Sequence, residues 1–220
     1  MYRFSRILAI VLLAVTVSFT LLGGVGTTCV AFKAEKFGAS MAKLVPVKSI
    51  FQALVIISIA AALFGAYTTY RLVRGKREAF NWALAFLGLA GTASAVQFYY
   101  SLTLRGSTAP NNIRLYITVV TMIVFLILRI PGIWRRTGFE QAEENRGVGL
   151  PGGLALMGCG LLILSVPVWG APTHMIDGIN TVNVLLLPLT GVGLALFMGG
   201  LALWVGIRSY QPEKAVPVQG

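Results

Sequence analysis

The sequence predicts an all-α protein, a polytopic helical bundle that crosses a membrane about six times. Of the 220 residues, 56% are hydrophobic and 11% are charged, whereas a typical soluble domain has about 25% charged residues. The mean hydropathy is +0.80, and long apolar runs are bounded by lysine and arginine. Because about 20 apolar residues cross the hydrocarbon core of a bilayer, each long run predicts one span.

The predicted spans contain no acidic residue and form one integral membrane domain, residues 1–220, with spans at approximately 7–32, 50–70, 79–104, 113–130, 152–169 and 184–207. Residues 1–26 also have the pattern of a signal peptide, since a basic start and an apolar core are followed by small residues. We expect an uncleaved first span, and cleavage is the alternative.

A short basic segment follows the first span. Between residues 32 and 49, Phe37, Met41, Leu44 and Val45 occupy one side of a helix, while lysines occupy much of the rest. This pattern predicts a short amphipathic helix lying on the membrane surface. A solvated loop is the alternative.

The fourth span is unusually short. Arg114 and Arg129 enclose 14 uncharged residues, or about 21 Å of helix, against a hydrocarbon core of about 30 Å. We expect both arginines to extend towards the membrane interfaces; the alternative is that one faces the protein interior. Pro131 predicts that the helix kinks or ends nearby.

The distribution of basic residues predicts the orientation. With six spans both termini lie on one side, and placing them in the cytoplasm gives that side twelve basic residues against six. Cytoplasmic loops carry the excess of lysine and arginine, so we expect cytoplasmic termini, a cytoplasmic loop at 135–149 and a plasma or inner membrane.

The last predicted span carries small residues at every fourth position, Gly191, Ala195 and Gly199. They share one helix face, which favours close contact between helices. Besides the lipid bilayer, the expected partners are other membrane subunits or further copies of the chain. Nucleic acid is not expected, because the basic residues flank spans rather than a polar domain.

Polar residues that could bind a ligand concentrate in two loops, 105–113 and 170–183, which the topology places on the extracytoplasmic side. The second loop holds the only histidine and the only aspartate of the chain. The candidate residues of this extracytoplasmic mouth are Asn111, Asn112, Arg114, His174, Asp177 and Asn180. The alternative is local: the asparagines and Asp177 cap neighbouring helices.

The sequence predicts no catalytic residue, metal site or cofactor. One histidine and one aspartate are two ligands short of a zinc site, and the spans hold no carboxylate to carry protons. The leading hypothesis is a non-enzymatic, structural or accessory subunit of a membrane assembly. One alternative is a facilitative channel or carrier whose extracytoplasmic vestibule accepts a small or anionic ligand. Another is a membrane enzyme that acts on a lipid headgroup with His174 as base.

Overall fold

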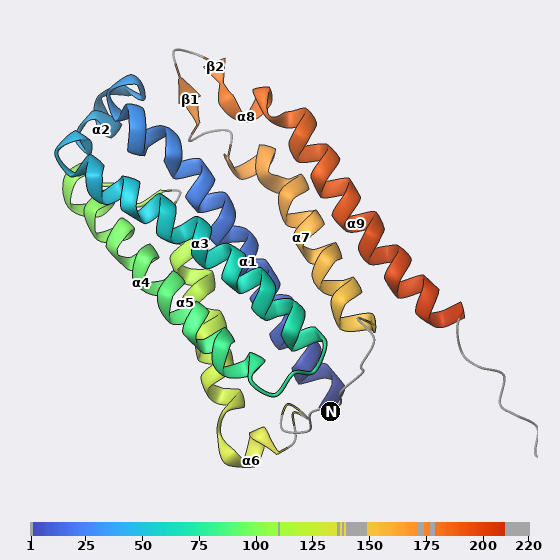
Figure 1. Ribbon diagram of the computed structural model, residues 1–220. Helices are drawn as coiled ribbons and strands as arrows, with labels where there is room; N and C mark the ends of the chain where they lie inside the picture. Colours follow the sequence, from blue (N-terminus) through green and yellow to red (C-terminus); the bar gives the residue numbers. More distant parts are fainter. Residues whose placement is uncertain are drawn as a thin grey trace, which may run out of the picture.

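Six long helices make up most of the molecule (Figure 1). They are α1 (Tyr2–Lys33), α3 (Lys48–Val73), α4 (Ala79–Arg105), α5 (Asn111–Leu128), α7 (Gly149–Gly170) and α9 (Leu186–Ser209). The structure, a computed structural model, describes residues 2–109, 111–135, 137, 139, 149–170, 174–176 and 179–209. All six helices are long and apolar enough to cross a membrane, which confirms the predicted helical membrane bundle.

Short elements gather at the two ends of the bundle. The end that we call distal holds η1 (Ala34–Lys36), α2 (Gly38–Ala42), η2 (Val45–Val47), β1 (Met175–Ile176), β2 (Ile179–Asn180) and α8 (Thr181–Val184). The two strands pair antiparallel. The opposite, proximal end holds the start of α1 and the short helix α6 (Pro131–Trp134).

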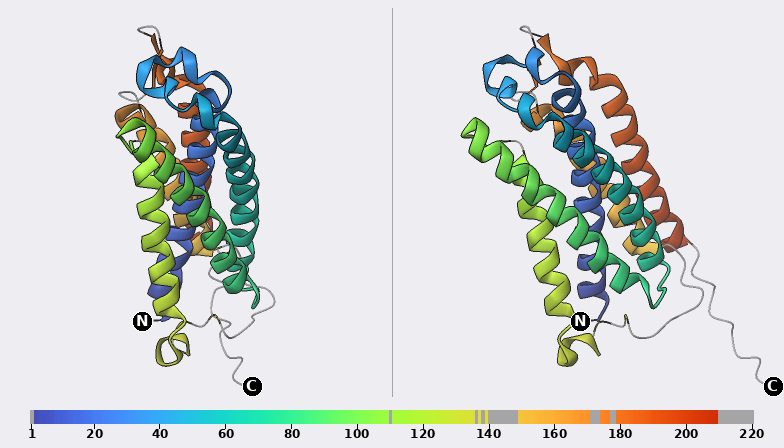
Figure 2. Two further views of the ribbon diagram at one scale, coloured as in Figure 1. Left: turned by 90° about the vertical axis from the view of Figure 1, so that its left-hand side faces the viewer. Right: turned by 60° about the vertical axis from the view of Figure 1, so that its left-hand side comes forward.

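Helix α1 is the centre of the bundle. It packs against α3, α5 and α7, while α4 packs against α3 and α5. Helices α4 and α5 therefore lie on one side of α1, and α7 and α9 lie on the other (Figures 1 and 2). Aromatic residues fill much of the core between these helices, and Phe80, Phe86 and Phe125 are fully buried.

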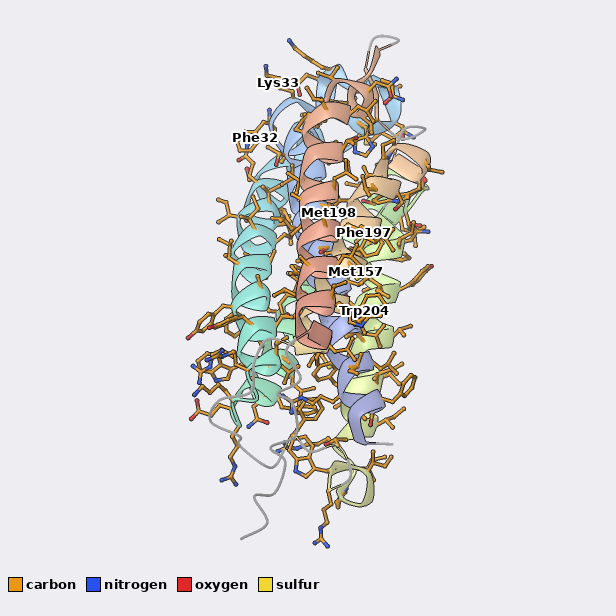
Figure 3. The ribbon with its side chains drawn as sticks, turned by 90° about the vertical axis from the view of Figure 1, so that its right-hand side faces the viewer. Phe32, Lys33, Met157, Phe197, Met198 and Trp204 are labelled. Atoms are coloured by element: carbon orange, nitrogen blue, oxygen red, sulfur yellow. The ribbon has the colours of Figure 1, made fainter. Side chains whose placement is uncertain are left out.

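Helix α9 is attached mainly to α7, through glycines that allow backbone contact. A Cβ atom on Gly160 would lie 2.7 Å from the carbonyl oxygen of Gly193, and one on Gly153 would lie 2.9 Å from that of Gly200. Figure 3 looks onto this side of the bundle, where Met157, Phe197 and Trp204 are labelled.

The predicted packing series is on a different part of α9. Around Gly191 and Gly199, no described atom comes within 4 Å of the position that a Cβ atom would take, and Ala195 is exposed. Within the described part of the chain, α9 thus uses Gly193 and Gly200 for packing and leaves the predicted series without a neighbour. The expected contact of that series with another chain stays a prediction.

The two arginines that enclose the fourth span behave differently. Arg129 is exposed at the proximal end, where its guanidinium lies 5.0 Å from the centre of the Trp134 ring. Helix α5 ends at Leu128, and α6 begins at Pro131, as the proline predicted. Arg114, in contrast, is only 3% exposed. The expectation that both arginines extend to the interfaces is wrong for Arg114, because polar side chains inside the bundle accept hydrogen bonds from its guanidinium.

The basic segment after α1 folds over the distal end of the bundle. It forms the short helical pieces η1, α2 and η2 instead of one amphipathic helix. Leu44 is buried in a cluster with Phe51 and Val55 of α3, while Lys36 and Lys43 are exposed. Leu44 and Met41 of the apolar side therefore face the bundle, whereas Val45 is exposed.

Candidate functional site

The distal end contains a cavity of about 270 Å³. Helix α1 contributes residues along its distal half, and side chains from α4 and α5 meet others from α7, α8 and α9 around it. Three of the predicted site residues, Asn111, Arg114 and His174, line this cavity. The two loops singled out in the sequence are thus brought to one place.

Arg114 reaches the interior because α1 has a glycine beside it. A Cβ atom on Gly23 would lie 2.7 Å from Cδ and 3.1 Å from Nη1 of Arg114. Any larger side chain would compete with the arginine for this space. Gly23 therefore allows a long cationic side chain to lie against the backbone of the central helix.

Polar groups from three helices surround the guanidinium. Arg114 Nη2 donates a hydrogen bond to Ser58 Oγ of α3 at 2.9 Å, and Nη1 donates to Gln97 Oε1 of α4 at 3.3 Å. Gln97 Nε2 donates in turn to Thr27 Oγ1 of α1 at 2.6 Å. Ser58, Gln97 and Thr27 are all buried, so this network crosses the inside of the bundle.

The charge of Arg114 has no acidic partner in the described part of the chain, where the ion pairs are Lys48–Glu35 and Arg71–Glu78. Its Nε is buried and makes no hydrogen bond. An arginine has five N–H donors, and the two bonds to Gln97 and Ser58 use two of them. Intramembrane charges are costly and ordinarily paired, so Arg114 presents unused donors and an uncompensated positive charge beside a cavity.

Asn111 extends the polar wall towards the distal end. Its Nδ2 donates to Ser101 Oγ of α4 at 3.3 Å, and both residues line the cavity. They lie with Arg114 in or beside the first turn of α5, where the partial positive charge of the helix favours anions. The helix terminus adds to the attraction that Arg114 creates.

His174 approaches α1 from the other side. Its Nδ1 lies 2.8 Å from the carbonyl oxygen of Gly170; because a carbonyl only accepts, Nδ1 carries the proton of this bond. The imidazole thereby caps the carboxyl end of α7. Its Nε2 lies 3.5 Å from a Cβ position on Gly26, so the second nitrogen faces the glycine side of α1 at the cavity.

The remaining predicted residues have other positions. Asn180 Oδ1 accepts from the backbone N–H of Val182 at 3.0 Å, which is the capping alternative. Asn112 is half-buried and is not part of the cavity lining, while its backbone N–H donates to Thr108. Asp177 lies outside the described residues. Asn180 belongs to the strand β2.

Sequence reasoning missed the residues that hold Arg114, which are Gly23, Thr27, Ser58 and Gln97. Gln97 carried a usable signal, because it is an amide well inside a predicted span, where an unpaired polar group is expensive. The small hydroxyl residues carried none. Hydroxyls in membrane helices usually bond to the carbonyl four residues earlier, as Thr20 does.

The exposed distal surface is basic. Lys33, Lys36 and Lys43 are exposed there, and Lys48 lies 4.0 Å from Glu35. Such a surface raises the local concentration of anions.

Within the described chain, no group of three or more His, Cys, Asp or Glu side chains that could hold a metal ion is present. No protein-family model, curated protein or solved structure matches the chain.

Proposed function

We propose that this protein is a facilitative carrier that binds an anionic ligand in the distal cavity. The observation that carries the proposal is Arg114, a buried guanidinium with an unpartnered Nε and no acidic neighbour among the described residues. An anion bound in the cavity balances the positive charge of Arg114. Arg114 is its main contact, while Asn111 adds an N–H donor.

Polar residues below Arg114 support a path deeper into the membrane. Thr118 and Thr121 of α5 are buried, and Thr121 Oγ1 lies 2.8 Å from Thr16 Oγ1 of α1. This seam leads from the cavity towards the middle of the bundle.

The proposal includes an orientation. Twelve basic residues against six favour the proximal end, with both termini, on the cytoplasmic side. The distal cavity then faces the extracytoplasmic side of a plasma or inner membrane. In this orientation the carrier takes up its ligand from outside or from the outer leaflet.

The first test is native mass spectrometry of the protein extracted gently from its own membrane, with the bound compounds identified after release. We expect an anionic compound at near-stoichiometric amount in the wild type and in Arg77→Gln, which removes an exposed charge. Arg114→Gln should lose at least nine-tenths of it, because its amide cannot neutralise an anion. An equal amount of the compound in Arg114→Gln would refute the proposal.

Flux gives the second test. Proteoliposomes containing the wild type should accumulate the recovered compound faster than liposomes without protein, and Arg114→Gln should abolish the difference. Double replacement of His174 and Asp177 by alanine should also reduce flux while folding is retained. Binding without flux would limit the role to a binding protein.

The second candidate function is that of an accessory subunit. It is favoured by the exposed series Gly191, Ala195 and Gly199, which meets no neighbour within the described chain and suits close contact with a helix of another subunit. The same mass spectrometry experiment tests this role. Stoichiometric protein partners that are lost on Ala195→Leu replacement would support it, and a partner-free protein would refute it.

A further inference from the structure

The cavity has an apolar side opposite the polar one. Helix α7 contributes Val166 and Trp169, and Leu185 and Leu189 come from the start of α9 and the turn before it. Trp169 is held in place, since Nε1 donates to Ser165 Oγ at 3.0 Å and the indole lies 5.8 Å from the Phe19 ring. A small hydrated anion would use none of this apolar surface.

The apolar part extends deeper than the polar part. On α1 the lining residues run from Phe19 to Val30, and Gly23 is the residue that touches Arg114. Phe19 is four residues nearer the proximal end than Gly23, or about 6 Å along the helix. The cavity therefore continues past the guanidinium for the length of several methylene groups.

The rim of the cavity reaches the lipid-facing surface. Val25 of α1, Ile113 of α5 and Leu185 line the cavity and are 52%, 41% and 51% exposed. Val25 lies eight residues before the end of α1 at Lys33, or about 12 Å along the axis. At that depth an exposed apolar residue faces lipid rather than water, so the cavity has an entrance from the bilayer.

We propose that the ligand is a single-chain amphiphile with an oxyanion head, a carboxylate or a phosphate, that enters from the bilayer. This inference rests on the proposed function and names its ligand class. The head lies at Arg114 and Asn111, and the first methylenes of the chain lie between Phe19, Trp169 and Val166. The volume of about 270 Å³ equals that of about nine water molecules, which fits a small head and part of one chain.

The inference predicts how affinity depends on chain length. Each buried methylene contributes about 0.8 kcal/mol, or roughly a fourfold gain in affinity. The 6 Å beyond Arg114 holds about four extended methylenes, since each adds about 1.3 Å, so octanoate should bind roughly two-hundredfold more tightly than acetate. Further lengthening should add little, because the deep apolar end of the cavity is then filled.

The test measures binding of acetate, octanoate and laurate, and of inorganic phosphate and dodecyl phosphate, to the full chain in nanodiscs of zwitterionic lipid. Affinities are corrected for partition into empty nanodiscs. Three variants accompany the wild type: Arg114→Gln and Arg114→Lys alter the head site, and Val166→Phe fills the deep apolar end. Thermal unfolding checks that each variant is folded.

Supporting results are a steep rise in affinity from acetate to octanoate, a loss of affinity for the whole series in Arg114→Gln, and partial rescue in Arg114→Lys. Val166→Phe should flatten the dependence of affinity on chain length. If acetate and octanoate bind equally tightly and both lose binding in Arg114→Gln, the proposal of an amphiphilic ligand is overturned, while the proposed anion site is supported. Binding of the whole series unaffected by Arg114→Gln, or no binding at all, would overturn both. Phosphates that bind when carboxylates do not would place the ligand among lipid phosphates.

Discussion

Replacing Arg114 and Gln97 together tests whether the buried network serves binding or folding. In Arg114→Met with Gln97→Leu, the positive charge disappears along with the amide that accepts from it. The hydroxyl of Ser58 can turn to the carbonyl oxygen of its own helix four residues earlier, as Ser94 does at 2.7 Å. Thr27 keeps its bond to the Gly23 carbonyl. The double variant thus leaves few buried polar atoms without partners.

The magnitudes favour the double variant over the single one. An arginine at the centre of a membrane helix costs about 2.5 to 3.5 kcal/mol on insertion scales, which is an upper limit for Arg114 in the first turn of α5. Each hydrogen bond to a charged group contributes about 1.5 to 3 kcal/mol. In Arg114→Met alone the two lost bonds, together about 3 to 6 kcal/mol, outweigh the relieved cost of the charge, and Gln97 Oε1 is left without its donor. Replacing a buried ion pair by apolar residues is often neutral or stabilising by about 1 to 4 kcal/mol, and we expect the same direction for the Arg114–Gln97 pair.

The assay is unfolding of the ligand-free protein in mild micelles by titration with a denaturing detergent, followed by circular dichroism. We expect the double variant to be at least as stable as the wild type, and the single variant to be less stable than the double by about 1 to 3 kcal/mol. Arg77→Met, at an exposed position, serves as the control. If the double variant is less stable than both the wild type and the single variant, the Arg114 network stabilises the fold, and the reasoning is refuted.

Three further predictions concern packing and capping, and the same unfolding assay checks them. Gly160→Ala should destabilise the protein by about 1 to 3 kcal/mol, because its Cβ would lie 2.7 Å from backbone atoms of α9. Gly158→Ala is the control and should leave stability unchanged, because its nearest contacts are at 3.8 Å. Equal effects of the two substitutions would contradict this prediction. Gly191→Ala should stabilise an isolated chain by up to about 1 kcal/mol through helix propensity, and a loss of stability would mean that this face is packed. Asn180→Ala should cost about 1 kcal/mol by removing the bond to Val182, and an unchanged midpoint would exclude a capping contribution.

The membrane bundle could be predicted because hydropathy and helix length are properties of contiguous sequence. The predicted first span ended at residue 32, and α1 ends at Lys33; the proline at 131 correctly marked the end of α5. These features depend on local rules, namely the thickness of the bilayer and the missing N–H of proline. They need no knowledge of which helices touch.

The partners of Arg114 could not be predicted because they depend on helix rotation and on contacts between distant segments. Ser58 and Gln97 are 56 and 17 residues away from Arg114 in the chain. The same limit explains the packing series on α9: a four-residue repeat identifies a face at Gly191 and Gly199, but the twist of the α7–α9 pair selects Gly193 and Gly200. The sequence placed the site residues at one end of the bundle without their partners.

The central position of α1 has a consequence for biogenesis. Among the described helices α1 is the first to be synthesised, and it is also the one on which α3, α5 and α7 pack. Each later helix therefore finds its docking surface already in the membrane when it leaves the translocation machinery, in keeping with the general order of domain folding during synthesis. However, the space beside Gly23 is filled only when α5 arrives with Arg114, and that beside Gly26 only when His174 follows α7. The ligand cavity is therefore among the last parts of the nascent protein to form.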